Sequence, residues 1–413
     1  MKTSTPERAE DKTREQIVPA LRSFVGWLDR FGEESYDHQS YYAGPIGGRA
    51  KRAYYDGGLL SKFAVVPMVF SEAFLPSARR IFWKPMRFPI ADAHYAMGFA
   101  FLCQALGEDV FHERAVHFLK VLDRTRSPGY SHYCWGYPFV WQTREGSIRE
   151  QMPLITTTPY AYEAFSGVYD IDSNPDWLEV MHSIAEHAME DIAESEFSEN
   201  ASTAGYSPTD KVGGVINAGA YRAGLLTAAS QRFSVDRYWQ AAERNVNFVL
   251  QTQEPDGSWP YAVDGARGFI DHYHTCFVMK ALAKIERMTG HEGCRRAIER
   301  GVEYYVNHLF DHQKCPKPFS RKPRLLVYRA ELYDYAECIN LGVLLRGRFS
   351  ELDACLDATV KDLLQRWHRP DGAFRARRLL LGWDNVPMHR WGVSQVFRSL
   401  SLLIRDLSNR GGE

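Results

Sequence analysis

Two kinds of helical segment alternate along the chain. Six segments are apolar on nearly every face, are rich in Ala, Gly, Ser or Cys, and follow a polar or turn-rich entry. A helix that is apolar nearly all round is usually buried, so these segments are predicted to be inner helices. They begin at Pro89, Leu154, Val215, Phe269, Glu331 and Val386.

Amphipathic segments with charged faces separate the apolar ones. Five of them are Val110–Thr125, Asp176–Ser195, Val235–Gln251, Glu292–Phe310 and Glu351–Trp367. Arg14–Phe31 also carries apolar residues at helical spacing and is predicted to pack beside the last inner helix, Val386–Ile404. Six inner and six outer helices in alternation predict an all-α fold, an (α/α)6 toroid of six helical hairpins in a single domain, 1–413.

The inner segments repeat at regular spacing. Their aligned entry residues are separated by 65, 61, 53, 61 and 56 positions, which suits a helical hairpin plus one long loop. The aligned residues are Tyr95, Tyr160, Tyr221, His274, Tyr335 and Trp391.

The connections between helices are unequal in length. Those that lead from an outer to an inner helix are long, and long loops in a compact domain usually carry function. A working cleft is therefore predicted at the mouth where the inner helices begin. Residues 32–86 fit no hairpin and are expected to form an irregular segment over this cleft, while residues 1–13 are expected to be disordered. The long connections are Arg126–Thr158, Glu196–Ile216, Thr252–Asp271, Asp311–Ala330 and His368–Met388.

Charge and cysteine content restrict the partners and the compartment. The formal net charge is −1, and no long run of one sign occurs, so nucleic acid and anionic membranes are not expected as partners. No apolar run reaches the roughly 18 residues of a spanning helix, so no membrane insertion is expected. The seven cysteines form no CxxC pair, and the N-terminus has no secretory signal, which together predict a cytoplasmic protein.

A glycine-containing motif relates the chain to known toroids. Gln253 to Trp259 reads Gln-Glu-Pro-Asp-Gly-Ser-Trp, and Arg369 to Phe374 is a weaker second copy preceded by His368. The first copy resembles the Q-x3-G-x-W motif of the terpenoid cyclases, where the Gln caps helix ends and the Trp packs between hairpins. The whole arrangement also resembles the six-hairpin toroids, a group that includes glycosidases and sugar epimerases. Both resemblances imply the fold.

A second motif resembles a zinc site but lacks its partners. Asp271 to Phe277 is similar to the zinc-histidine segment of the prenyltransferase β subunit, whose upstream Asp-x-Cys pair is missing here. The acid and diphosphate motifs of terpene cyclases are missing too. No zinc and no other cofactor is therefore expected, and terpene chemistry is disfavoured.

Two loop segments point to sugars. Residues 134–144 and 153–165 resemble a family of toroid proteins associated with bacterial and archaeal surface-polysaccharide synthesis. This resemblance implies a sugar or an oligosaccharide as the substrate and says nothing about the reaction.

Five residues at helix entries are candidates for catalysis. Histidine transfers protons near neutral pH, and a neighbouring carboxylate orients its ring. The alternative is that the Asp is a helix N-cap and the histidines only pack. The candidates are Asp271, His272, His274, Tyr335 and His389.

Further residues are candidates for substrate binding. Flat aromatic rings stack on sugars, Arg pairs with a uronate carboxylate, and paired carboxylates serve in glycosidases. The alternative is that these side chains anchor loops or helix starts. The candidates are Trp135, Tyr137, Trp141, Arg144, Tyr160, Glu163, Asp334, Glu337 and Trp391.

Together these patterns predict a carbohydrate-active enzyme that works by acid/base chemistry, as an epimerase, a lyase or a hydrolase. A non-catalytic toroid that binds glycan or protein, and a prenyl- or terpenoid-processing enzyme, remain alternatives. The sequence leaves the oligomeric state open.

Overall fold

The computed structural model of the protein describes residues 6–323 and 326–410. Residues 6–13, which were expected to be disordered, form the start of the first helix, α1 (Pro6–Phe31). Residues 1–5 lie outside the described residues.

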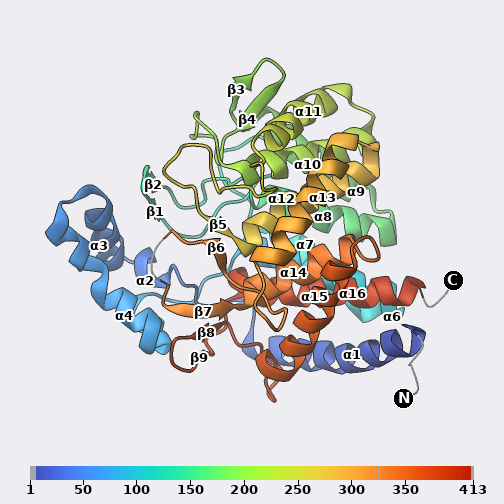
Figure 1. Ribbon diagram of the computed structural model, residues 1–413, viewed down its shortest axis with the longest axis horizontal. Coiled ribbons are helices and arrows are strands. Elements are labelled where there is room, and N and C mark those ends of the chain that lie inside the picture. The colour runs from blue at the N-terminus through green and yellow to red at the C-terminus, as the bar shows by residue number, and fades with distance from the viewer. Residues whose placement is uncertain (1–5, 324–325, 411–413) are drawn as a thin grey trace.

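Six inner helices form a closed ring (Figure 1). Each packs against the next, and the last packs against the first, as the all-α toroid prediction requires. Their bounds are α6 (Pro89–Leu106), α8 (Thr158–Asp172), α10 (Ile216–Phe233), α12 (His272–Thr289), α14 (Leu332–Leu344) and α16 (Ser394–Arg410).

The outer helices follow the amphipathic segments closely. Two of them end in a short π-helical turn, His187–Asp191 after α9 and Leu363–Trp367 after α15. The strand that follows α9 begins at Glu194, so this outer helix ends earlier than predicted. The outer helices are α7 (Asp109–Arg124), α9 (Pro175–Glu186), α11 (Asp236–Gln251), α13 (Glu292–His308) and α15 (Ser350–Asp362), with α1 as the sixth.

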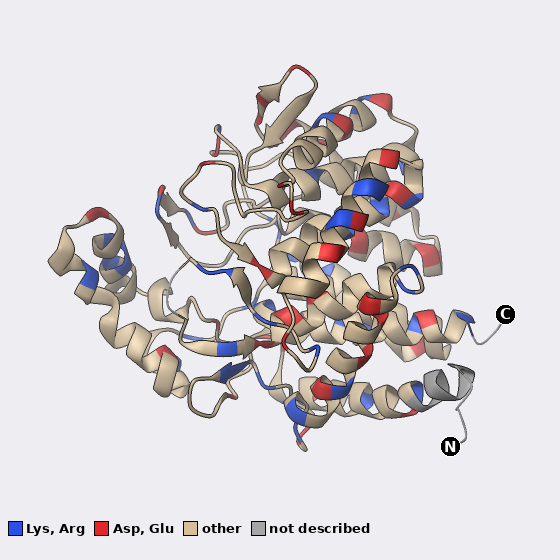
Figure 2. Ribbon diagram, viewed as in Figure 1, with Lys and Arg blue, Asp and Glu red and all other residues tan. Residues whose placement is uncertain are grey.

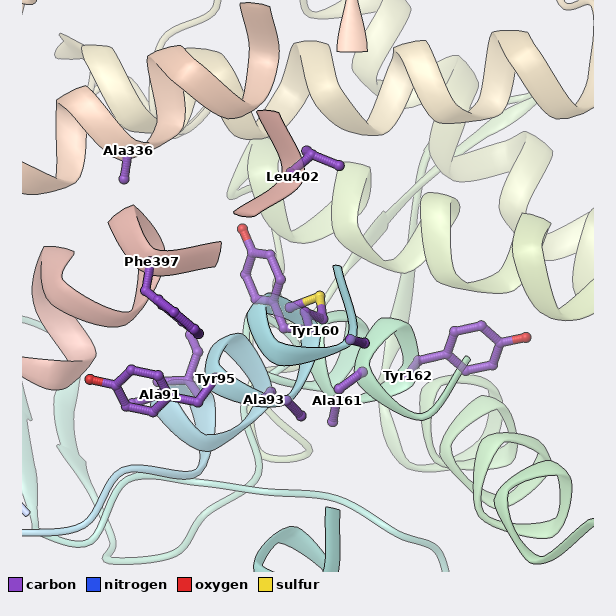
Figure 3. Packing of buried hydrophobic residues seen from close by; sticks show 14 of the residues in the cluster. Ala91, Ala93, Tyr95, Tyr160, Ala161, Tyr162, Ala336, Phe397 and Leu402 are labelled. Carbon is purple, nitrogen blue, oxygen red and sulfur yellow. The ribbon is translucent and has the colours of Figure 1, made fainter. Parts of the chain in front are cut away.

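The core lies between the inner and outer helices. Figure 3 shows Tyr95 of α6 beside Phe397 of α16, with ring centroids 5.9 Å apart. On α8, Tyr160 and Tyr162 point in different directions in the same view. Only the tyrosine at position 160 reaches the other inner helices, through a hydrogen bond to Tyr221 of α10.

Helix α1 completes the outer layer of the ring as its sixth helix. The two copies of the glycine-containing motif make equivalent contacts with outer helices. Gly257, at φ +91°, lies against the backbone carbonyl of Arg300 in α13, and Gly372, at φ +94°, lies in the same way against Ser23 in α1. A Cβ atom at either glycine would come within 2.3 Å of that carbonyl oxygen, so the positions require glycine. The prediction that Arg14–Phe31 packs beside the last inner helix is confirmed, since Phe24 stacks on Phe397 at 5.2 Å.

Short strands occupy the long loops; most of them lie on the left in Figure 1, whereas β3 and β4 lie at the top. They pair as antiparallel hairpins or ladders and tie neighbouring loops together. Their bounds are β1 (Trp141–Thr143), β2 (Gly146–Ile148), β3 (Glu194–Ser198), β4 (Ala201–Ala204), β5 (Ile270–Asp271), β6 (Phe319–Arg321), β7 (Tyr328–Glu331), β8 (Arg377–Leu379) and β9 (Trp383–Asp384).

The segment 32–86 is mostly helical, not irregular as predicted. Pro45 starts one of its helices, where the missing N–H costs nothing, and Gly57 and Gly58 separate that helix from the next. The helices project from the body at the mouth end of the ring (Figure 1). They are α2 (Ser40–Ala43), α3 (Pro45–Asp56), a 3-10 turn (Leu59–Val65), α4 (Val66–Phe74), a 3-10 turn (Pro76–Ala78) and α5 (Arg79–Phe82).

Candidate active site

An aspartate–histidine pair lies at the start of α12. Asp271 is the N-cap of the helix, and its Oδ1 accepts the His274 backbone N–H at 3.1 Å. Its other oxygen lies 2.7 Å from His274 Nδ1, and because a carboxylate only accepts, Nδ1 carries the proton. Within the described residues His274 Nε2 has no partner, so this nitrogen is available to a ligand. Asp271 is buried and His274 is partly exposed, as expected for a carboxylate that orients a working imidazole.

Partly exposed aromatic side chains surround this histidine. They come from three long loops and two helix starts, and each lies within ring-contact distance of a neighbour. Tyr261 and Tyr273 lie 4.7 and 4.4 Å from His274, and Tyr273 in turn contacts Trp391 at 5.5 Å. We call the set the mouth ring: Tyr137, Trp141, Tyr206, Tyr261, Tyr273, His274, Arg390 and Trp391.

Arg390 joins Trp391 to Tyr137 in the mouth ring. It forms a bidentate ion pair with buried Asp37, at 2.6 and 2.9 Å, and its guanidinium lies 4.5 Å from the centre of the Tyr137 ring. The pairing outweighs burial and holds the pKa of Asp37 far below its ordinary value. The His38 ring lies against Trp391, tilted by 60° with centroids 4.5 Å apart, and burial lowers the pKa of His38 well below the ordinary value. The segment that precedes α2 therefore supplies part of the site.

Two buried carboxylates lie behind the mouth ring. Glu331 accepts the indole N–H of Trp391 at 2.7 Å and pairs with Arg377 at 3.2 Å. Neither oxygen of Asp334 has a hydrogen-bond partner among the described residues. Burial, and then the charges of Glu331 and Asp271, raise the pKa of Asp334 well above its ordinary value. The surroundings of Asp334 thus favour the neutral form of its carboxyl group.

The axis of the ring below the mouth is polar and charged. Glu337 accepts from Lys280 and from Arg398, the latter at 3.0 Å, and Arg398 also donates to His94 Nδ1 at 3.2 Å. All these groups are buried, and the single carboxylate of Glu337 is shared by the two cations. Burial lowers the pKa of Lys280 to about 8, although Glu337 opposes the shift. A void of about 30 Å³ beside Lys280 leaves room for little more than one water molecule, so this network supports the site from below.

A cleft of about 890 Å³ opens on the other side of the first long loop. Residues 136–142 form the wall between the two regions: Tyr137 and Trp141 belong to the mouth ring, while Pro138, Val140 and Gln142 line the cleft. The cleft also carries aromatic and cationic side chains, which suit an anionic sugar. These are Tyr42, Trp83, Phe139, Arg49, Lys84, Arg124 and Arg126.

Three of the five catalytic candidates lie away from the mouth. Both nitrogens of His272 are occupied, by Tyr305 at 2.6 Å and by the Leu309 carbonyl at 3.2 Å. Those of His389 are occupied by Tyr95 at 2.6 Å and by the Gly32 carbonyl at 3.0 Å. Burial lowers the pKa of His272 to about 3 and that of His389 to about 4, so both are neutral packing residues.

Tyr335 is the third of these. It donates to Asp362 at 2.8 Å and packs on Trp367 between α14 and α15. Asp271, one of His272 and His274, Tyr335 and His389 were expected to meet at one mouth. The structure brings Asp271 and His274 together there and places His272, Tyr335 and His389 between helices, away from the mouth.

Several binding candidates also have other roles. Trp135 is buried and donates to the Leu122 carbonyl at 2.8 Å, as Trp259 donates to that of Val249 at 2.9 Å, so it anchors a loop between helices. Arg144 is exposed at the turn between β1 and β2. Of the seven remaining candidates, three lie in the axial region and four at or behind the mouth. The axial ones are Tyr160, Glu163 and Glu337, and those at or behind the mouth are Tyr137, Trp141 and Trp391, with Asp334 beneath.

Sequence analysis missed five contributors to the site. Tyr206 and Tyr261 lie in long loops that lead to an inner helix, as Tyr137 does. This shared position could have identified them as candidates from the sequence. The others are Tyr273, Arg390 and His38. No sequence pattern separates their directions from those of their neighbours.

Comparison with solved structures establishes the fold. A cellobiose 2-epimerase from Spirochaeta thermophila matches with a TM-score of 0.60 at 12% identity, over 84% of this chain and 99% of that chain. A sugar epimerase from a ruminal bacterium matches at 0.58 and 12%, over 79% and 88%. An inactive variant of an α-1,6-mannanase from Salegentibacter, in complex with α-1,6-mannotriose, matches at 0.56 and 11%, over 78% and 89%.

The chain therefore has the six-hairpin (α/α)6 toroid fold found in these carbohydrate-active enzymes, as the sequence resemblance implied. No protein-family model and no curated protein matches the sequence. The likeness to terpenoid cyclases stays a prediction.

The described residues contain neither a metal-binding group nor a membrane-spanning helix. They contain no group of three His, Cys, Asp or Glu side chains that could hold a metal ion. No helix among them is long and apolar enough to cross a membrane.

Proposed function

We propose that the protein is an enzyme that acts on a sugar or an oligosaccharide by acid/base chemistry at the mouth ring. The observation that carries the proposal is the Asp271–His274 pair, whose free Nε2 lies among partly exposed aromatic rings. A sugar stacked on these rings would present its hydroxyl and C–H groups to that nitrogen. The carbohydrate-active enzymes that share the fold support the same substrate class.

In this proposal His274 moves the proton and Asp271 stabilises it. Nε2 accepts a proton from the substrate, the imidazolium that forms is stabilised by the Asp271 carboxylate, and the proton is then returned. Burial and the neighbouring carboxylates raise the pKa of Asp334, behind the ring, which disfavours a second negative charge close to Asp271. Epimerisation, elimination and hydrolysis all use such a proton transfer, and the proposal covers these three reactions.

The polar character of the mouth favours this function over terpenoid processing. The mouth ring holds four tyrosines, an imidazole and a guanidinium, whereas a terpenoid site is an apolar pocket. On the resemblance of residues 134–144 and 153–165, we propose that the sugar belongs to a surface polysaccharide. The free state of the seven cysteines supports a cytoplasmic location, which cell fractionation would test.

A matched set of variants tests the function. Neutral and uronate-containing oligosaccharides are incubated in D₂O, and NMR detects deuterium exchange, epimers, unsaturated products and new reducing ends. His274→Gln is expected to lower the rate roughly 10²–10⁴-fold, the usual value of a proton-transfer group, with little change in melting temperature. Asp271→Asn also lowers it, and His312→Gln, at an exposed histidine, leaves it unchanged.

If His274→Gln turns over the active sugar at the wild-type rate, the catalytic assignment is wrong. If no sugar is turned over, yet Trp141→Ala weakens glycan binding measured by calorimetry, the protein is a non-catalytic glycan-binding toroid.

A further inference from the structure

Exposed hydrophobic side chains are concentrated in one small part of the molecule. Among the described residues nineteen large hydrophobic side chains are exposed, and eleven of them lie between Ile46 and Ile81. We call residues 45–82 the arm. Soluble monomers rarely expose a continuous apolar surface, so this concentration marks an interaction site.

The exposed residues form a stripe along the arm. Val66, Phe70 and Phe74 follow one another at intervals of four within α4, which places them on one helical face, and Leu59 and Phe63 in the preceding 3-10 turn are exposed as well. Phe63 is 65% exposed and Phe70 is 56% exposed.

The other face of the arm is bound to the body. Met68 and Ala73 are buried there, and Glu72 pairs with Arg377 of β8 at 2.5 Å. This ion pair ties α4 to the body, while the apolar stripe stays exposed. The turn that follows β8 adds Leu380 and Leu381, which are exposed as well.

The arm is also basic, although the whole chain is nearly neutral. It contains six Lys and Arg residues and two acidic ones, against a net charge of −1 for the chain. Both acids are paired, Glu72 with Arg377 and Asp56 with Arg52. Within the described residues Arg49, Lys62 and Arg80 are exposed and have no ion-pair partner, and Figure 2 shows the basic bands on α3.

We propose that the arm is a docking surface for an anionic lipid bilayer. An apolar helical face flanked by unpaired cations is the chemistry that places a helix in the interface of a membrane with anionic headgroups. Since none of the described helices can span a bilayer, the protein binds at the surface. A second copy packed arm to arm would bring two sets of cations together, so charge disfavours that occupant.

The position of the arm gives this docking a consequence. The arm and the mouth loops lie at the same end of the ring (Figure 1). A docked molecule therefore holds its mouth beside the bilayer. This inference differs from the expectation that anionic membranes are not partners, which rested on the charge of the whole chain.

Co-sedimentation of the full-length protein with lipid vesicles tests the proposal. Wild-type protein is expected to bind vesicles of about one third phosphatidylglycerol in phosphatidylcholine, and to bind pure phosphatidylcholine at least roughly tenfold more weakly. Phe63→Ser/Phe70→Ser abolishes binding, and Lys62→Glu/Arg80→Glu weakens it roughly tenfold or more at low salt. Val110→Ser/Val212→Ser changes two exposed hydrophobic residues elsewhere and keeps full binding.

Three results would overturn the proposal. One is that wild-type protein fails to bind the anionic vesicles, and another is that it binds neutral and anionic vesicles equally. The third is a dimer in lipid-free buffer, measured by light scattering, that Phe63→Ser/Phe70→Ser dissociates, since a second copy would then cover the stripe. Circular dichroism and thermal melts confirm that each variant is folded.

Discussion

Mild acid should destabilise this protein through histidines that the fold keeps neutral. His389 lies where α1, α6 and α16 meet, with Trp27 and Phe31 against its ring. Burial lowers its pKa from 6.5 to about 4. As the pH falls through 6.5, His389 becomes protonated in the unfolded chain but stays neutral in the folded protein. Stability is therefore full above pH 6.5 and is lost as the pH falls toward 4.

The expected loss follows from the two pKa values. At about pH 5, a histidine with a pKa of 6.5 when unfolded and about 4 when folded costs about 2 kcal/mol of unfolding free energy. His272, with a folded pKa of about 3, costs about the same, so the two together remove about 4 kcal/mol. This is a large fraction of the total stability of a typical domain.

Urea denaturation, followed by tryptophan fluorescence at about pH 7.5 and about pH 5, measures the loss. Substitution of His389 by Gln removes the titrating group, so the difference between the two pH values should shrink by about 2 kcal/mol. His312→Gln, at an exposed histidine, should keep the wild-type difference. If His389→Gln and the wild type lose the same free energy, His389 is not held neutral by burial and the reasoning fails.

Four further predictions follow from the site and its supports. Asp334→Asn should raise the melting temperature at neutral pH, because burial and neighbouring carboxylates disfavour the ionised form of Asp334 in the folded protein and Asn carries no charge. The gain in melting temperature should be larger at pH 8 than at pH 5, and a gain that is no larger at pH 8 would contradict this reasoning. Gly392→Ala should cost roughly 2 kcal/mol or more, because the residue has φ +108° and its Cβ would lie 2.9 Å from a side chain of α14; Gly382→Ala, with positive φ but open space, should cost only about 1 kcal/mol in urea melts. Lys84→Glu together with Arg49→Glu should weaken calorimetric binding of an anionic oligosaccharide and leave that of a neutral one unchanged; equal losses would argue against a charge-selective cleft. Dialysis against a chelator should leave sugar turnover unchanged, and activity that is lost and then restored by zinc would show that a metal site was overlooked.

The ring was predictable because its signals are local. A segment that is apolar all round must be buried, and an amphipathic one must lie outside it, whatever the rest of the chain does. The motif at Gln253 adds a local rule, since Gly257 and Gly372 each allow a tight turn against the next outer helix. The closure by α1 followed from the count of hairpins.

The directions of the site residues were not predictable in the same way. Successive residues on a helix point about 100° apart, so residues at the same level of the ring do not share a direction. His272 and His274 are two positions apart, and one packs on α13 while the other lies in the mouth ring. Tyr333 and Tyr335 divide likewise, toward Trp391 and toward Trp367.

The sequence by itself determined the inner and outer helices of the ring, their burial and their order, since these depend on periodicity within each segment. The tertiary structure decided which side chains meet at the mouth. Tyr206 and Tyr261 reach it through loops, and Arg390 reaches it through a non-helical turn before α16. Tertiary structure also decided that the apolar stripe of the arm is exposed, because only packing shows which face of α4 the body covers. Such positions depend on how all six hairpins pack against one another, and no local sequence pattern predicts this packing.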